Sequence, residues 1–145
     1  MIPFFVMLGA ILGARAAGAV SVEPLDSWLA ATRIGLALMF VFTGVAHFNR
    51  TRDELIRMVP PQLPFPAALV TLTGVAELLG AMGLLLPSTA RWAAIGLAVL
   101  LVLMLPANVH AARAGLSVAG RPATPLVLRL PIQLVWIGLL WWIAV

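Results

Sequence analysis

A succession of apolar runs, each about as long as a helix that crosses a bilayer, dominates this sequence. A transmembrane helix needs roughly 20 mostly apolar residues to cross a hydrocarbon core of about 30 Å. With 63% hydrophobic and only 10% charged residues in 145, the chain has far more apolar surface than a soluble fold can bury. We therefore expect an all-α integral membrane protein, and neither a soluble nor a secreted domain.

Prolines and charged residues divide the runs into expected spans. The third span starts at Pro66, a residue suited to a helix N-terminus, and the Pro-rich stretch 58–65 is expected to be an elbow over the end of the bundle. We expect an antiparallel bundle of four core transmembrane helices plus an N-terminal span, in one membrane domain over 1–145. The spans are expected at about 2–20, 31–48, 66–86, 91–112 and 126–145.

The first run raises the question of a signal peptide. A signal peptide has a basic region ahead of its apolar stretch, and the first five residues carry no charge. Residues 2–20 are therefore expected to remain as a span. Residues 21–27, with Glu23 and Asp26, are expected to be a short loop that leads to an interfacial Trp28.

The basic residues, all of them arginine, lie near the ends of the expected spans. They are not clustered on a soluble face, so we expect no nucleic-acid partner. The positive-inside rule predicts a multi-pass protein of the cell membrane with its N-terminus inside and its C-terminus outside. The inner set is Arg50, Arg52, Arg57, Arg113, Arg121 and Arg129, and the outer set is Arg15, Arg33 and Arg91.

Glu77 lies midway along the third span, where an ionisable side chain is expensive and calls for a reason. Gly74, Glu77 and Ala81 share one helix face, and the small residues allow close helix contact, so Glu77 is expected to point into the bundle. It is either a proton-handling or ligand-binding carboxylate, or a structural link between helices. Both readings stay open from the sequence.

Further polar residues are expected in the inner half of the bundle. His47 and His110 close the second and fourth spans, and Asn108, Arg129 and Gln133 lie nearby in the expected topology. The hypothesis of an inward-opening cavity lined by Glu77, Asn108, Gln133 and His47 competes with buried polar links. We expect no haem or other metal at the two histidines, because histidines at helix ends are more often interfacial or capping residues. Pro106 predicts either a binding notch or a plain kink.

The chain resembles the DoxX-like family of small membrane proteins. The resemblance rests on an ordered set of motifs that covers about 33 to 145: Arg33-Ile34-Gly35-Leu36, Phe42-Thr43-Gly44-Val45-Ala46-His47-Phe48, Met58-Val59-Pro60-Pro61, Gly74-Val75-Ala76-Glu77-Leu78-Leu79-Gly80 and Leu105-Pro106-Ala107-Asn108. It implies a four-helix membrane core and an association with membrane redox or assembly complexes, including a quinone-dependent oxidoreductase. It places Glu77, His47 and Asn108 at motif positions and supplies no catalytic residues.

Two functional hypotheses follow. The first is an accessory or assembly subunit of a membrane complex, surrounded by lipid and by other membrane subunits, and not a self-contained enzyme. The second is a quinone- or lipid-interacting oxidoreductase component, because a quinone needs an apolar slot with one or two polar groups. Cysteine is absent, so thiol-based redox chemistry is excluded and any redox role needs a borrowed cofactor. A small transporter is the weakest alternative, because inverted repeats are lacking.

Overall fold

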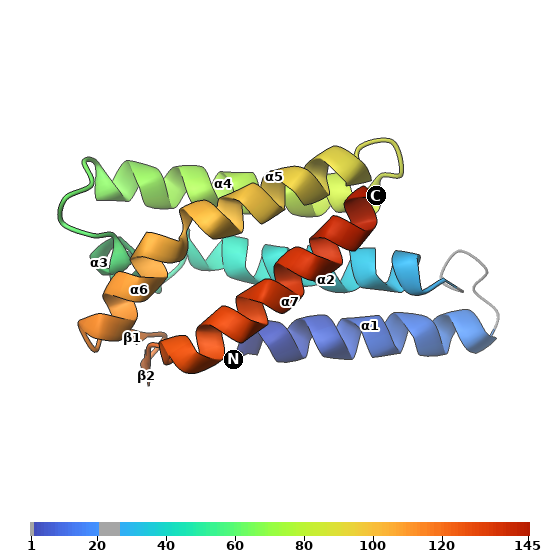
Figure 1. Cartoon of the computed structure of the whole chain (residues 1–145), viewed down its shortest axis with the longest axis horizontal. Helices are drawn as coiled ribbons and strands as arrows, with labels where there is room; N and C mark the ends of the chain where they lie inside the picture. The colour runs from blue at the N-terminus through green and yellow to red at the C-terminus, as the bar shows by residue number, and fades with distance from the viewer. Residues whose placement is uncertain (1, 21–26) are drawn as a thin grey trace.

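The computed structural model describes residues 2–20 and 27–145 of the chain. The expected loop with Glu23 and Asp26 therefore lies outside the described residues, apart from Ser27. The described part is mostly helical (Figure 1). Its elements are α1 (Ile2–Val20), α2 (Trp28–Ala46), α3 (Arg52–Met58), α4 (Pro66–Leu85), α5 (Ala90–Leu103), α6 (Leu105–Arg113), β1 (Ser117–Val118), β2 (Arg121–Pro122) and α7 (Leu126–Ala144).

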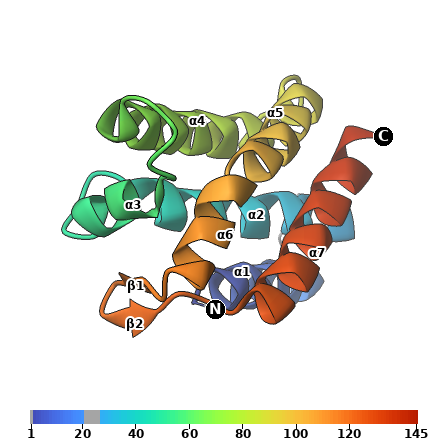
Figure 2. The ribbon, with the colours of Figure 1, turned by 60° about the vertical axis from the view of Figure 1, so that its left-hand side comes forward.

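The helices pack as a series of neighbours in the order α1, α2, α4, α5 and α7, with α4 in the middle. Helix α2 packs against α1 and α4, and α5 packs against α4 and α7 (Figures 1 and 2). The apolar core lies where these helices meet. Its largest fully buried side chains are Phe40, Leu36, Met39, Leu84, Leu97 and Leu140.

Local chemistry explains where several helices begin. The Ser27 hydroxyl accepts a hydrogen bond of 3.0 Å from the Ala30 N–H, which caps α2 and starts it before the expected residue 31. Helix α4 begins at Pro66, after Phe65 in a left-handed conformation with φ 54°. The expected fourth span is divided at Met104 into α5 and α6. Pro106 has no N–H to donate and lies in the first turn of α6, which accounts for the break.

A short β-hairpin lies in the connection between α6 and α7, in the segment between the expected fourth and fifth spans. Val118 pairs with Arg121 in an antiparallel ladder. Ala119 and Gly120 between them both have positive φ, 54° and 71°, as the tight turn of a two-residue hairpin requires.

Five helical segments are long and apolar enough to cross a membrane: α1, α2, α4, α7 and the α5–α6 pair. The expectation of five apolar segments of spanning length is confirmed. Large apolar side chains such as Phe5, Leu72, Leu79 and Leu134 are more than 60% exposed. A lipid environment satisfies such an exterior and water does not, which supports a multi-pass membrane protein.

Candidate functional site

Helices α2 and α4 approach each other closely because glycines line the contact between them. A Cβ atom on Gly74 would lie 2.5 Å from Cβ of His47 and 2.9 Å from Cε2 of Phe48. A Cβ atom on Gly44 would lie 2.9 Å from Leu78. The two backbones therefore pack at a distance that a larger residue would prevent, as in other small-residue membrane helix contacts.

Glu77 is buried in this contact, as the helix-face pattern predicts. Its side chain is 3% exposed. The hydroxyl of Thr43 in α2 lies 2.6 Å from Oε2 of Glu77 and donates a hydrogen bond to it. Thr43 Oγ1 also lies 3.2 Å from the Met39 carbonyl oxygen, but the single hydroxyl hydrogen has its shortest acceptor in Glu77. Thr43 thus joins the two helices.

His47, one turn beyond Thr43, lies at the C-cap of α2. Its Nδ1 is 3.0 Å from the Thr43 carbonyl oxygen. Burial lowers the pKa of His47 below its usual 6.5, and the positive charge of Arg52 lowers it further, against opposing hydrogen bonds to backbone. We call Thr43, His47 and Glu77 the α2–α4 polar cluster.

Arg52 closes the end of the same contact. Its guanidinium donates to the His47 carbonyl at 3.0 Å, the Ala67 carbonyl at 3.1 Å and the Thr71 hydroxyl at 2.9 Å. It therefore ties the C-terminal end of α2 to the first turns of α4. The sequence assigns Arg52 only to membrane topology, and its structural role has no sequence signal of its own.

The inner face of α7 carries further buried donors. Gln133 is 4% exposed, and its Nε2 donates to the Leu101 carbonyl of α5 at 2.8 Å. Nε of Arg129 and Nε1 of Trp136 are buried without a hydrogen-bond partner among the described residues. No hydrogen bond joins the side chains of Arg129 and Glu77 among the described residues.

The structure separates some residues that the sequence groups together. His110 binds the Pro-rich elbow, with its Nδ1 3.0 Å from the Met58 carbonyl oxygen, and His47 binds its own helix. Asn108 is buried at 8% exposure. Within the described residues, no group of three or more histidines and acidic residues is placed to hold a metal ion. Thr43 was missed by sequence reasoning, although its four-residue spacing from His47 places both on one face.

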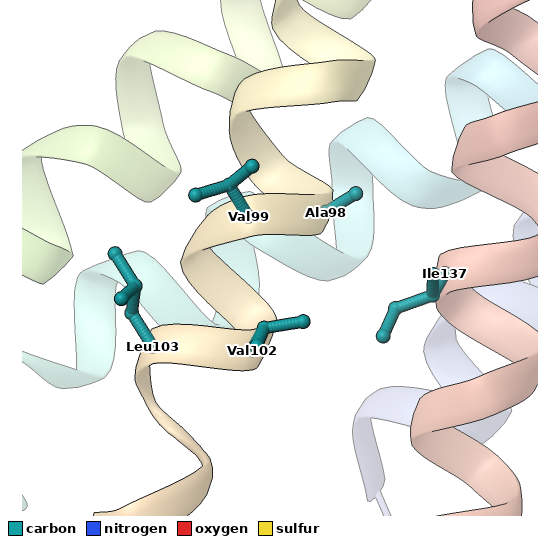
Figure 3. Close-up of a pocket in the computed structure, with 5 residues that line it drawn as sticks. All are labelled: Ala98, Val99, Val102, Leu103 and Ile137. Carbon is teal, nitrogen blue, oxygen red and sulfur yellow. The ribbon is translucent and has the colours of Figure 1, made fainter.

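Two grooves on the described surface lie elsewhere. One, of about 260 Å³, lies between α5 and α7 and is lined by Ala98, Val99, Val102, Leu103 and Ile137 (Figure 3). A second, of about 120 Å³, continues it toward Trp141 and shares Ala98 and Val99 with it. Both are apolar, and neither is lined by a residue of the α2–α4 polar cluster.

Fold and buried polar residues together define a small multi-pass helical membrane protein with a set of polar groups buried between its helices. The chain belongs to the family described as Domain of unknown function (DUF8561), whose model matches residues 36–144. No curated protein and no solved structure matches the chain.

Proposed function

We propose that this protein is an accessory or assembly subunit of a membrane complex, of the respiratory or redox type that the resemblance to DoxX-like proteins suggests. The single observation that carries the proposal is the close packing around Glu77. Its carboxylate accepts from Thr43, and glycines bring α2 and α4 together on both sides of it. Such a carboxylate acts as a link between helices.

The surface supports the same reading. The two grooves between α5 and α7 are apolar and offer no acid, base or nucleophile for chemistry. Most of the remaining exterior carries exposed apolar side chains on the spanning helices. A protein of this kind contributes helix surface to an assembly, with lipid and other membrane subunits as its partners.

The proposed architecture has four core helices, α2, α4, α5–α6 and α7, in an antiparallel bundle, with α1 added at the N-terminus. The family match begins at residue 36, inside α2, and thus leaves α1 outside the matched segment. We place the protein in the cell membrane with its N-terminus inside and its C-terminus outside. Exposed Arg50, Arg57 and Arg113 near span ends on one side support this orientation.

Affinity purification of the tagged full chain in a mild detergent tests the proposal. We expect a membrane protein partner in stoichiometric amount, retained in Glu77→Gln because that variant keeps an acceptor for Thr43. In cells, we expect deletion of this chain to abolish the activity of a complex. Expression of the wild type or of Glu77→Gln should restore that activity. Purification of the chain alone, with no partner and no such loss, would overturn the proposal.

One observation favours a second candidate, a quinone- or lipid-interacting oxidoreductase component. Arg129 Nε and Trp136 Nε1 are buried donors with no hydrogen-bond partner among residues 2–20 and 27–145, and they lie on the inner face of α7 on either side of Gln133. A quinone carbonyl is an acceptor that suits such donors. Extraction of the purified protein with organic solvent followed by mass spectrometry tests this candidate. It requires a bound quinone whose amount is lower in Trp136→Phe than in the wild type, because phenylalanine keeps an aromatic ring and lacks the N–H.

A further inference from the structure

The nine arginines of the chain fall into two groups by what their guanidinium groups do. Five of them are exposed: Arg50, Arg57, Arg91, Arg113 and Arg121. Arg91 lies with its guanidinium carbon 5.9 Å from the centre of the Trp92 ring. Within the described residues, the guanidinium groups of the other four, Arg50, Arg57, Arg113 and Arg121, make no hydrogen bond, ion pair or ring contact. We call these four the free arginines.

Most other arginines have structural roles. Arg52 donates to three groups between α2 and α4, and Arg33 Nε donates to the Leu84 carbonyl at 2.6 Å. Arg15 lies 5.0 Å from the centre of the Trp28 ring. The free arginines are therefore set apart by their lack of any such role.

The free arginines come from segments that gather at one end of the bundle. Arg50 precedes α3, Arg57 is in its last turn, Arg113 ends α6 and Arg121 is in β2. Helix α3 packs against α6 and β1, and Figure 2 shows these elements together at one end. The Ala119 N–H donates a hydrogen bond to Glu54 of α3, which ties the hairpin to that helix.

Negative charge at this end is small. Asp53 is the one exposed acid among residues 27–145, and Glu54 is engaged by the hairpin. Four guanidinium groups against these two carboxylates leave the end with a net positive charge. An anionic partner is therefore favoured there.

The position of this end relative to the spans identifies the partner. Helices α2 and α6 end here, and α4 and α7 begin here. Phe48, Leu63 and Phe65 are exposed beside these ends, at 48%, 45% and 79%. Basic and apolar side chains together at the ends of spans suit the depth of lipid headgroups, where apolar groups enter the acyl boundary and cations meet phosphate.

We propose that the free arginines form a binding surface for the phosphate headgroups of anionic phospholipids in the leaflet that this end faces. Guanidinium groups recognise phosphate oxygens with two parallel hydrogen bonds, which a solvated surface arginine is free to make. Each basic residue near an anionic leaflet strengthens attraction by about fivefold in binding constant. This inference stands independently of the proposed subunit function.

The test compares the full-length protein in nanodiscs of phosphatidylcholine alone and of phosphatidylcholine with phosphatidylglycerol. We expect native mass spectrometry to detect phosphatidylglycerol retained on the protein above its bulk proportion, and retention to fall as salt is raised. The variant with Arg50, Arg57, Arg113 and Arg121 all changed to Gln should lose this enrichment. The same four changed to Lys should keep much of it, and Arg91→Gln, at the other end, should keep it all.

Equal enrichment in the Gln variant and the wild type would overturn the proposal. So would a wild type that shows no enrichment, including one whose basic end binds a soluble acidic peptide and not the lipid. Should the fourfold Gln variant not fold in phosphatidylcholine, the pairs Arg50/Arg57→Gln and Arg113/Arg121→Gln replace it. Each pair is then expected to weaken retention by more than tenfold, and unchanged retention in both would equally reject the surface.

Discussion

The hydroxyl of Thr43 in α2 donates a hydrogen bond of 2.6 Å to the carboxylate of Glu77 in α4. It is a side-chain hydrogen bond between these two helices at the depth where an ionisable residue needs a partner most. The adjoining glycines hold the helices close enough for it to form. The pair therefore gives Glu77 a structural role that can be measured directly.

A double-mutant cycle measures this link. Thr43→Val and Glu77→Leu each remove one partner, and we expect a coupling of about 0.6 kcal/mol and no more than about 1.7 kcal/mol, as for other hydrogen bonds between membrane helices. Equilibrium unfolding in mixed micelles supplies the four free energies. Thr73→Val is the matched control, because the Thr73 hydroxyl donates to the Leu69 carbonyl of its own helix at 2.9 Å. Additive effects for Thr43 and Glu77, as for Thr73 and Glu77, would contradict the link.

Gly74→Ala tests the close approach of α2 and α4. The added Cβ would lie 2.5 Å from Cβ of His47, an atom fixed to the backbone that no side-chain rotation can move away. The helices must separate, and we expect a loss of about 1–3 kcal/mol in unfolding free energy.

The matched control for this change is Gly96→Ala in α5. Its Cβ would meet nothing within 4 Å, so helix propensity alone predicts a gain of about 0.5–1 kcal/mol. Similar losses in both variants would show that the space beside Gly74 is not what matters.

The sequence predicts the spans and the inward face of α4 because both depend on local patterns. Apolar length defines the spans, and helical spacing places Gly74, Glu77 and Ala81 on one face, which the structure buries. The partner of Glu77 depends instead on how α2 is rotated against α4. That rotation is set by packing across the whole contact, so the sequence alone does not identify Thr43, among the polar residues, as the partner of Glu77.

The same distinction separates the two histidines. Both close a span, and the sequence groups them in one polar region. His110 in fact contacts the Met58 carbonyl because α3 packs against α6. The hydrophobic periodicity of the sequence does not predict this pairing of segments. The hairpin at 117–122 escaped prediction for a related reason, since two residue pairs are too few to give an alternating pattern.

Gln133→Leu tests the link between α7 and α5. It leaves the Leu101 carbonyl without the donor that now lies 2.8 Å away, and we expect a loss of about 1 kcal/mol in unfolding free energy. Gln62→Leu is the control, because Gln62 is exposed in the elbow before α4. A loss in Gln62→Leu as large as that in Gln133→Leu would assign the effect to the amide-to-leucine change and not to the lost hydrogen bond.

The lowered pKa of His47 predicts that acid destabilises the bundle. In the unfolded chain this imidazole titrates near its usual 6.5, whereas burial keeps it neutral to lower pH in the folded protein. As the pH falls below about 6.5 the unfolded state therefore binds the proton first, and stability present above that pH is lost down to the folded pKa.

Melting temperatures between pH 7.5 and pH 5 should fall more steeply in the wild type than in His47→Gln. The two proteins differ only at residue 47, so the difference in slope isolates the contribution of His47. Parallel slopes in the wild type and His47→Gln would mean that His47 binds its proton equally well in the folded and unfolded states. That result would contradict the lowering of its pKa by burial and by the charge of Arg52.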